Sequence, residues 1–209
     1  MDSTDAADLI AELHEDKAEH EAADRFRNRA ALLIAFLAAV LAIGGLGGGN
    51  ATDDLLVNNI RASDAWAFYQ AKNIRQTVYK IAAEEVEAGL GGMPADRQQA
   101  AQKRLQEYRA TIARYDDEPD ASAPSDPLKG EGKKQLMARA QSFEAARDKA
   151  AEQDNNFDLA EVALQLALVL GSVAILAVNR MILILSAALG VIGSLLTANG
   201  FLSLVPLGM

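Results

Sequence analysis

The side chains best suited to recognition chemistry lie close together, between positions 62 and 76. Trp66, the only Trp of the chain, and Tyr69 offer rigid contact area, while Lys72 and Arg75 offer contacts to anions. The candidate partner or ligand surface consists of Asp64, Trp66, Tyr69, Gln70, Lys72 and Arg75. In the simpler interpretation, which we favour, the aromatic side chains pack on a neighbouring helix and Asp64 and Lys72 face water.

A second polar pair, Glu161 and Gln165, lies one helical turn apart near the start of a long apolar run. An ionisable side chain inside a membrane span is by default a candidate for ion passage or for hydrogen bonding between helices. Because Glu161 lies so close to the beginning of the run, we expect it at the level of the lipid headgroups, where it stays hydrated.

The rest of the chain offers little for catalysis. It contains no Cys, and its two His, His14 and His20, are not spaced to share one helix face. No nucleophile with a base, metal cluster or pair of buried carboxylates can be assembled from its motifs. We therefore predict a protein that is not an enzyme, with no catalytic residue, cofactor or metal. The net charge of −9 argues against a nucleic-acid partner.

Three apolar runs, at 30–49, 159–178 and 181–199, determine the elements that carry these residues. Each is close to the ~20 residues that a helix needs to cross ~30 Å of hydrocarbon. The predicted fold class is all-α, with three transmembrane helices and an extramembrane helical hairpin or coiled-coil domain inserted between the first and the second. The expected segments are a cytoplasmic helix (1–29), the first span (30–49), a periplasmic domain (50–158) with a flexible loop (116–132), two further spans (159–178 and 181–199) and a short tail (200–209).

The charges that flank the runs indicate the orientation. Arg25, Arg27 and Arg29 precede the first run, whereas Asp and Asn residues follow it and precede the second run. The connection between the second and third runs, Asn179-Arg180, carries a base again. We therefore predict a bacterial inner-membrane protein with a cytoplasmic N-terminus and periplasmic residues 50–158. At the tight connection we expect Asn179 to adopt the left-handed conformation that ends a helix.

The segment between the first two runs has the periodicity of helices. Thr52 is placed to cap the start of a long helix, after a glycine run at 44–49 that can bend or admit another backbone. That helix carries an apolar stripe, beside which lies a second line of Ala62, Trp66 and Tyr69. The stripe consists of Leu56, Ile60, Ala67, Ala71, Ile74, Val78 and Ile81.

Two further helices follow after a break at 89–94, where Pro94 is placed for the first turn of a new helix. Apolar residues at 101–115 have the four-and-three spacing of a coiled coil. A last stripe, from Leu136 to Phe157, continues without a breaker into the second apolar run.

A family resemblance rests on the run Ala62-Ser-Asp-Ala-Trp-Ala-Phe-Tyr-Gln-Ala-Lys72, followed by Ile74-Arg-Gln76. This run resembles the signature of a bacterial membrane-protein family of unknown function. Members of that family are similar in layout, with a charged N-terminal segment, one span, a helical domain and a terminal hairpin of two spans. The resemblance implies a fold and a membrane location, and it implies no chemistry.

Small residues at four-residue steps mark faces on which helices approach each other closely in lipid. Such strips occur in the second and third runs: Ala163, Ala167 and Gly171, then Ser186, Gly190 and Ser194. Because three spans cannot bury all of these faces, we expect a homo-oligomer or docking to another membrane protein.

Together these features predict a non-enzymatic integral inner-membrane protein that acts as a structural, accessory or interaction component. Its expected partners are the lipid bilayer and either further copies of itself or other membrane proteins. The alternative is an oligomeric channel or transporter-like protein with a polar path near Glu161 and Gln165.

Overall fold

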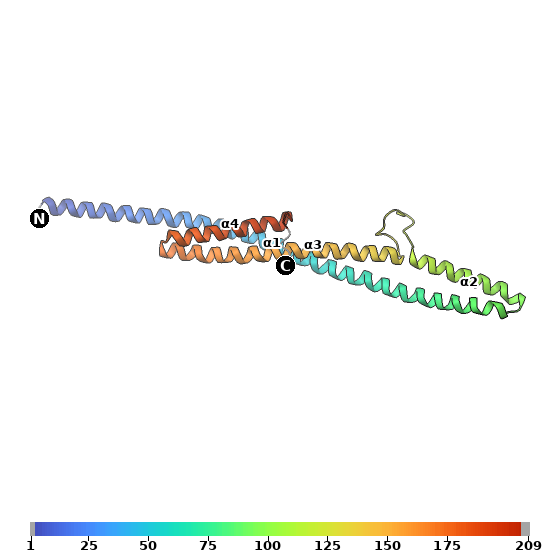
Figure 1. Ribbon diagram of the computed structural model, residues 1–209. Helices are drawn as coiled ribbons and strands as arrows, with labels where there is room; N and C mark the ends of the chain where they lie inside the picture. Colours follow the sequence, from blue (N-terminus) through green and yellow to red (C-terminus); the bar gives the residue numbers. More distant parts are fainter. Residues whose placement is uncertain (1–2, 206–209) are drawn as a thin grey trace. The chain divides into compact units, whose positions relative to one another are not determined.

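A computed structural model describes residues 3–205, with the side chains described from Leu13 onward except at position 15. This part of the chain forms four α-helices and a single 3-10 turn, and it contains no β-strand (Figure 1). The elements are α1 (Ser3–Gly89), the 3-10 turn (Leu90–Gly92), α2 (Ala95–Asp116), α3 (Lys133–Ala177) and α4 (Arg180–Leu202). The all-α prediction is confirmed for these residues.

Three of the helices, α1, α3 and α4, are long and apolar enough to cross a membrane. Only 22%, 28% and 22% of the residues in their most apolar windows are buried within the chain itself. Most of the apolar surface of each window therefore requires another cover, either lipid or a further helix.

α1 is one unbroken helix of 87 residues. The prediction that a new helix starts at Thr52 is therefore wrong. The Thr52 hydroxyl lies within α1, 3.1 Å from the backbone oxygen of Gly48 and 2.7 Å from Oδ1 of Asp154, and these two acceptors share its single proton. A glycine lowers helix stability by about 1 kcal/mol relative to alanine, so packing by neighbouring helices must hold the glycine run at 44–49 in the helix.

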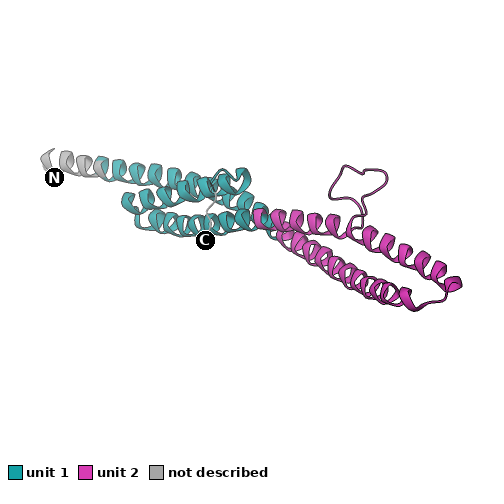
Figure 2. Ribbon diagram, turned by 45° about the vertical axis from the view of Figure 1, so that its right-hand side comes forward, with its two compact units in different colours: residues 1–52, 150–209 teal, residues 53–149 magenta. Residues whose placement is uncertain are grey.

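The chain divides into two compact units, which are coloured separately in Figure 2. Unit 1 consists of residues 1–52 and 150–209, and unit 2 consists of residues 53–149. The core of unit 1 is formed by Leu37 of α1 with Leu164 and Ala167 of α3, and Leu189 of α4 packs against it.

The α3–α4 reversal takes two residues. The left-handed residue is Val178, with φ +48°, and not Asn179 as the sequence predicts. Asn179 is extended, and its side-chain oxygen accepts hydrogen bonds from the amides of Met181 (2.9 Å) and Ile182 (3.4 Å). An N-cap requires this extended backbone, so capping α4 excludes the left-handed conformation at Asn179.

In unit 2, the predicted stripes on α2 and α3 face inward. Leu105 of α2 is buried, and the rings of Tyr108 and Tyr115 meet Tyr79 of α1 edge to face, with centroids 5.7 and 5.8 Å apart. On α3, Leu136 and Ala140 of the predicted stripe are buried.

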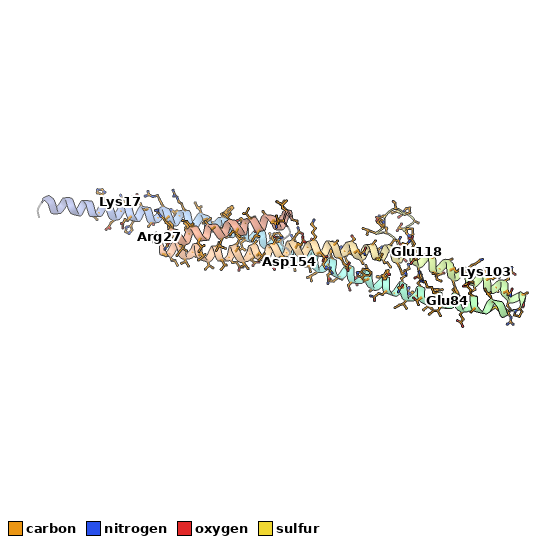
Figure 3. The ribbon with its side chains drawn as sticks, viewed as in Figure 1. Lys17, Arg27, Glu84, Lys103, Glu118 and Asp154 are labelled. Carbon is orange, nitrogen blue, oxygen red and sulfur yellow. The ribbon has the colours of Figure 1, made fainter. Side chains whose placement is uncertain are left out.

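The segment between α2 and α3 has no regular element apart from a bridge pair between Pro119 and Gly130. Gly130 has φ +118°, a conformation that only glycine adopts readily. The base of this loop is closed by hydrogen bonds, including Glu131 N–H to the carbonyl of Glu118 at 2.9 Å. Glu118 is labelled in Figure 3.

Candidate functional site

The residues of the candidate surface divide between two faces of α1. Trp66 and Tyr69 face into unit 2, where their rings meet edge to face with centroids 5.6 Å apart. The Trp66 indole donates a hydrogen bond from Nε1 to Oε1 of Glu144 on α3, at 2.8 Å. These two aromatic residues therefore pack between helices of the chain.

Lys72 also points inward, which corrects the expectation that it faces water. Its side chain is only 13% exposed, and Nζ lies 2.8 Å from Oε2 of Glu118. Nζ also donates to the backbone oxygen of Glu131 and lies 5.3 Å from the centroid of the Tyr115 ring. A carboxylate, a carbonyl and a ring face replace the water that the ammonium loses, so Lys72 ties both ends of the loop to α1.

Asp117 and Lys134 form a second tie at the base of the loop, and both are exposed. Nζ of Lys134 donates to Oδ2 of Asp117 at 2.8 Å, and Nε2 of Gln135 donates to Oδ1 at 2.8 Å. The hydrogen bond from Lys134, followed by that from Gln135, lowers the pKa of Asp117 below its ordinary value. The same pairing raises the pKa of Lys134. Both groups are therefore charged across the neutral range.

The other members of the candidate surface, Asp64, Gln70 and Arg75, are exposed. They form no hydrogen bond or ion pair with any residue that the structure describes. The surface predicted as one site is thus an internal contact on one face of α1 and a free polar fringe on another.

Beside that fringe runs the apolar stripe, which is exposed. Ile60, Ile74, Val78 and Ile81 are 59%, 65%, 60% and 60% exposed. From Ile60 onward this stripe, together with Val57 and with Asp64 of the fringe, forms a line of exposed positions at steps of three and four residues. We call this line the outer seam: Val57, Ile60, Asp64, Ala67, Ala71, Ile74, Val78 and Ile81. Such spacing is that of a coiled-coil contact face, yet within unit 2 no helix covers it.

The opposite face of α1 makes the contacts within unit 2. It is marked by Ala62, Tyr69, Gln76 and Ala83, seven residues apart, of which Ala62, Gln76 and Ala83 are buried. Gln76 donates from Nε2 to the carbonyl of Ile112 on α2, at 2.8 Å. α1 therefore has two contact faces in this region, of which the chain itself uses one. The seven-residue recurrence of Ala62, Gln76 and Ala83 around Tyr69 is the signal that could have identified the inner face from the sequence.

A cavity of about 330 Å³ lies between α1 and α3 in unit 2, next to the outer seam. Its lining includes Phe68 and Arg75. Two other basic residues line it, but both are already engaged: Lys72 by the loop, and Arg139 by the carbonyls of Leu128 (3.0 Å) and Gly130 (2.8 Å). Arg75 is then the one lining cation with no described partner. A single exposed Arg is not enough to make this cavity an anion site.

Glu161 and Gln165 lie on an exposed face of α3. Nε2 of Gln165 donates to Oε1 of Glu161 at 2.8 Å, so the two side chains satisfy each other within one helix.

The small-residue strips lie largely inside unit 1. Ala167, Gly171, Ser186 and Gly190 are buried, while Ala163 and Ser194 are half-buried. The hydroxyl of Ser186 donates to the backbone oxygen of Ala167 at 2.6 Å, which links α4 to α3. A Cβ at Gly190 would lie 2.6 Å from Cδ2 of Leu37 on α1. Both strips therefore serve the packing of this chain with itself.

Comparison with known protein families gives a match over most of the chain. The family described as "Domain of unknown function (DUF4337)" matches residues 26–203. No curated protein and no solved structure matches the chain. The matched range includes all of α2, α3 and α4 and most of α1, so it covers the apolar helices together with the region that carries the outer seam.

Proposed function

We propose, from the premise that the chain belongs to the DUF4337 family, that it is a non-enzymatic membrane protein that assembles with further copies of itself. It acts as a structural or accessory scaffold, and the outer seam of α1 is the contact between copies. The exposed seam is the observation that carries this proposal.

Membrane insertion is the first part of the proposal. α1, α3 and α4 contribute the spans, and the bases before the first run and at Arg180 favour an N-terminus inside and residues 50–158 outside a bacterial inner membrane. Lipid then covers the apolar surface that the chain leaves open.

Single-cysteine labelling tests the orientation, because the chain has no Cys of its own. In intact spheroplasts, Ser122→Cys is expected to react with a membrane-impermeant thiol reagent, and Ser3→Cys is expected to react only after the membrane is opened. The opposite pattern would reverse the proposed topology. Labelling of both variants in intact spheroplasts would show that no membrane separates residue 3 from residue 122.

A second copy is the occupant that fits the outer seam. Copies inserted in one membrane share one direction, so their α1 helices are parallel and equivalent residues meet at the same height. Ile60, Ile74 and Val78 then each meet their own equivalent, and the small residues Ala67 and Ala71 let the backbones approach closely. Covering a half-exposed aliphatic side chain contributes about 1 kcal/mol, and such contacts recur along the seam.

The flanks of the seam do not oppose this contact. Neighbouring positions on one side are Leu56, Ser63, Gln70 and Thr77, and those on the other are Arg61, Phe68, Arg75 and Ala82. In a parallel pair the two flanks face each other, so each Arg meets a neutral residue and the flanks place no like charges opposite each other. Asp64 is the single charged residue within the seam. In a parallel pair it meets its own equivalent, and the apolar contacts along the rest of the seam must outweigh this local repulsion.

The test is the mass of the protein in mild detergent. The wild type is expected to be oligomeric, and Ile74→Lys is expected to shift it to monomer because two ammonium groups would meet in the seam. Asn59→Lys adds the same charge at an exposed position outside the seam and is expected to leave the mass unchanged.

Disulfide formation in the same preparation tests whether equivalent residues of two α1 helices lie opposite each other. Ile74→Cys is expected to cross-link two copies, since only equivalent seam positions bring Cα atoms within the ~7 Å that a disulfide tolerates, and Asn59→Cys is expected not to. A monomeric wild type, or an Ile74→Lys variant of unchanged mass, would refute the seam as the contact between copies.

A further inference from the structure

A second surface feature lies in unit 1, at the cytoplasmic end of the proposed spans. A cavity of about 500 Å³ opens between α1 and α4. Its lining includes Arg25, Phe26 and Arg29 of α1 and Arg180, Leu183 and Ile184 of α4. Three guanidinium groups therefore surround one cavity together with three large apolar side chains.

The positive charge of this cavity is poorly compensated. Arg29 and Arg180 form no hydrogen bond or ion pair with any residue that the structure describes. Arg25 lies 3.9 Å from Glu21, and both side chains are more than half exposed, so water screens that pair strongly. Arg29 and Arg180 thus have no counter-ion among the described residues, and an anion bound between them would be attracted by both.

The apolar part of the lining indicates what kind of anion fits. Phe26 lies just before the first apolar run, and Leu183 and Ile184 lie inside the third, where Ile184 is 62% exposed. The cavity thus joins a cationic rim to surface that hydrocarbon covers. A small soluble anion would use only the rim, whereas a phospholipid would use both parts. Basic pockets at the cytoplasmic ends of spans are suited to anionic headgroups.

We propose that this cavity binds the phosphate headgroup of an anionic phospholipid, with an acyl chain along Leu183 and Ile184. The proposal rests on the membrane insertion proposed above and is independent of the outer seam. The amides of Met181 and Ile182 at the start of α4 are already capped by Asn179, so the contacts to the phosphate come from the Arg side chains.

Native mass spectrometry of the full-length protein in mild detergent tests the site. We expect phosphatidylglycerol to be retained more tightly than phosphatidylethanolamine with the same acyl chains. Arg29→Gln and Arg180→Gln are each expected to weaken that retention about tenfold, the effect of losing one hydrogen bond between charged groups. Both residues are exposed, so neither substitution disturbs the packing of unit 1.

Arg27→Gln is the matched control. Arg27, labelled in Figure 3, is on the same helix but does not line the cavity, and NH1 lies 3.4 Å from Asp24. An equal loss of binding in this variant would indicate diffuse attraction and refute a site, as would equal retention of the two lipids. Glycerol 3-phosphate competing as well as the lipid would show a site for free phosphate. Carbonate extraction of wild-type membranes separates the two proposals, because release of the protein would refute insertion itself.

Discussion

Gly47→Leu is expected to destabilise unit 1, whereas Gly45→Leu, two residues away on the same helix, is expected to leave it intact. A Cβ at Gly47 would lie 2.5 Å from Cζ of Phe157 and 2.7 Å from Cζ of Phe201, while a Cβ at Gly45 meets nothing within 4 Å. Both changes increase helix propensity and apolarity alike. The expected difference between them therefore comes from space alone.

Phe157 makes the Gly47 position intolerant. Its side chain is only 4% exposed, its ring packs edge to face on Phe201 with centroids 4.9 Å apart, and a Cβ at Gly200 would lie 2.7 Å from it. Forcing a larger side chain into such a site costs about 1–3 kcal/mol or more. We expect the melting temperature in detergent to fall by roughly 5–10 °C for Gly47→Leu.

Gly45→Leu is the control that separates a steric clash from an effect on membrane insertion. Wild-type melting temperatures for both Gly47→Leu and Gly45→Leu would show that Phe157 can move aside and that the glycines are not needed to make room for its ring. A similar fall in both variants would instead point to the insertion of the first span, which the two substitutions affect alike.

The glycine run shows why the sequence resolved only part of unit 1. Its composition allowed either a bend or a close approach of another helix, and the choice depends on Phe157, which is more than a hundred residues away. Thr52 has the same explanation. A Thr before two Asp has the pattern of an N-cap, but the helix continues through Thr52, and its hydroxyl donates to Asp154, which is also distant in sequence.

The helices of unit 2 were predictable to different degrees. α2 and α3 each have one apolar face, so their stripes identified the buried residues. α1 has two contact faces in this region, and the more apolar one is exposed. Its inner face is built from Ala62, Ala65 and Ala83 with the buried amide of Gln76, since small side chains let α2 and α3 approach closely. A prediction from hydrophobicity alone would bury the outer face of α1 and expose the inner one, which is the reverse of the structure.

The position of Lys72 has a related cause. A Lys beside Asp64 and Arg75 has the pattern of a solvated face, and nothing local indicates otherwise. Its acceptors, Glu118 and the carbonyl of Glu131, belong to the loop between α2 and α3, and they reach Lys72 only when the loop folds back onto α1.

Gly190→Leu is expected to disrupt the packing of α4, and Leu37→Ala is expected to restore part of it. A side chain at Gly190 would collide with Leu37, whose Cδ2 and Cδ1 would lie 2.6 and 2.9 Å from the new Cβ. Leu37 is only 2% exposed, so it has no free space into which to turn. Shortening it to alanine empties the volume that the new leucine needs.

Each single change is expected to be harmful for the opposite reason. Leu37→Ala leaves a cavity, which costs about 2–5 kcal/mol in a buried site, and Gly190→Leu overfills the same space. In the double variant the two defects offset each other, so we expect a favourable coupling of about 0.5–3 kcal/mol. Melting temperature and protease resistance in detergent measure all four proteins.

Ala188→Leu is the control, because Ala188 is exposed on the same helix and the substitution adds a larger side chain without meeting Leu37. We expect it to melt like the wild type. Strictly additive losses in the double variant would mean that Gly190 does not face Leu37. Loss of the oligomer by Gly190→Leu with an undisturbed melting temperature would instead place the Ser186–Ser194 strip between copies. Because Gly190 packs on Leu37 and Ser186 bonds to Ala167, we expect unit 1 itself to lose stability, while the outer seam of α1 remains free to join one copy to the next.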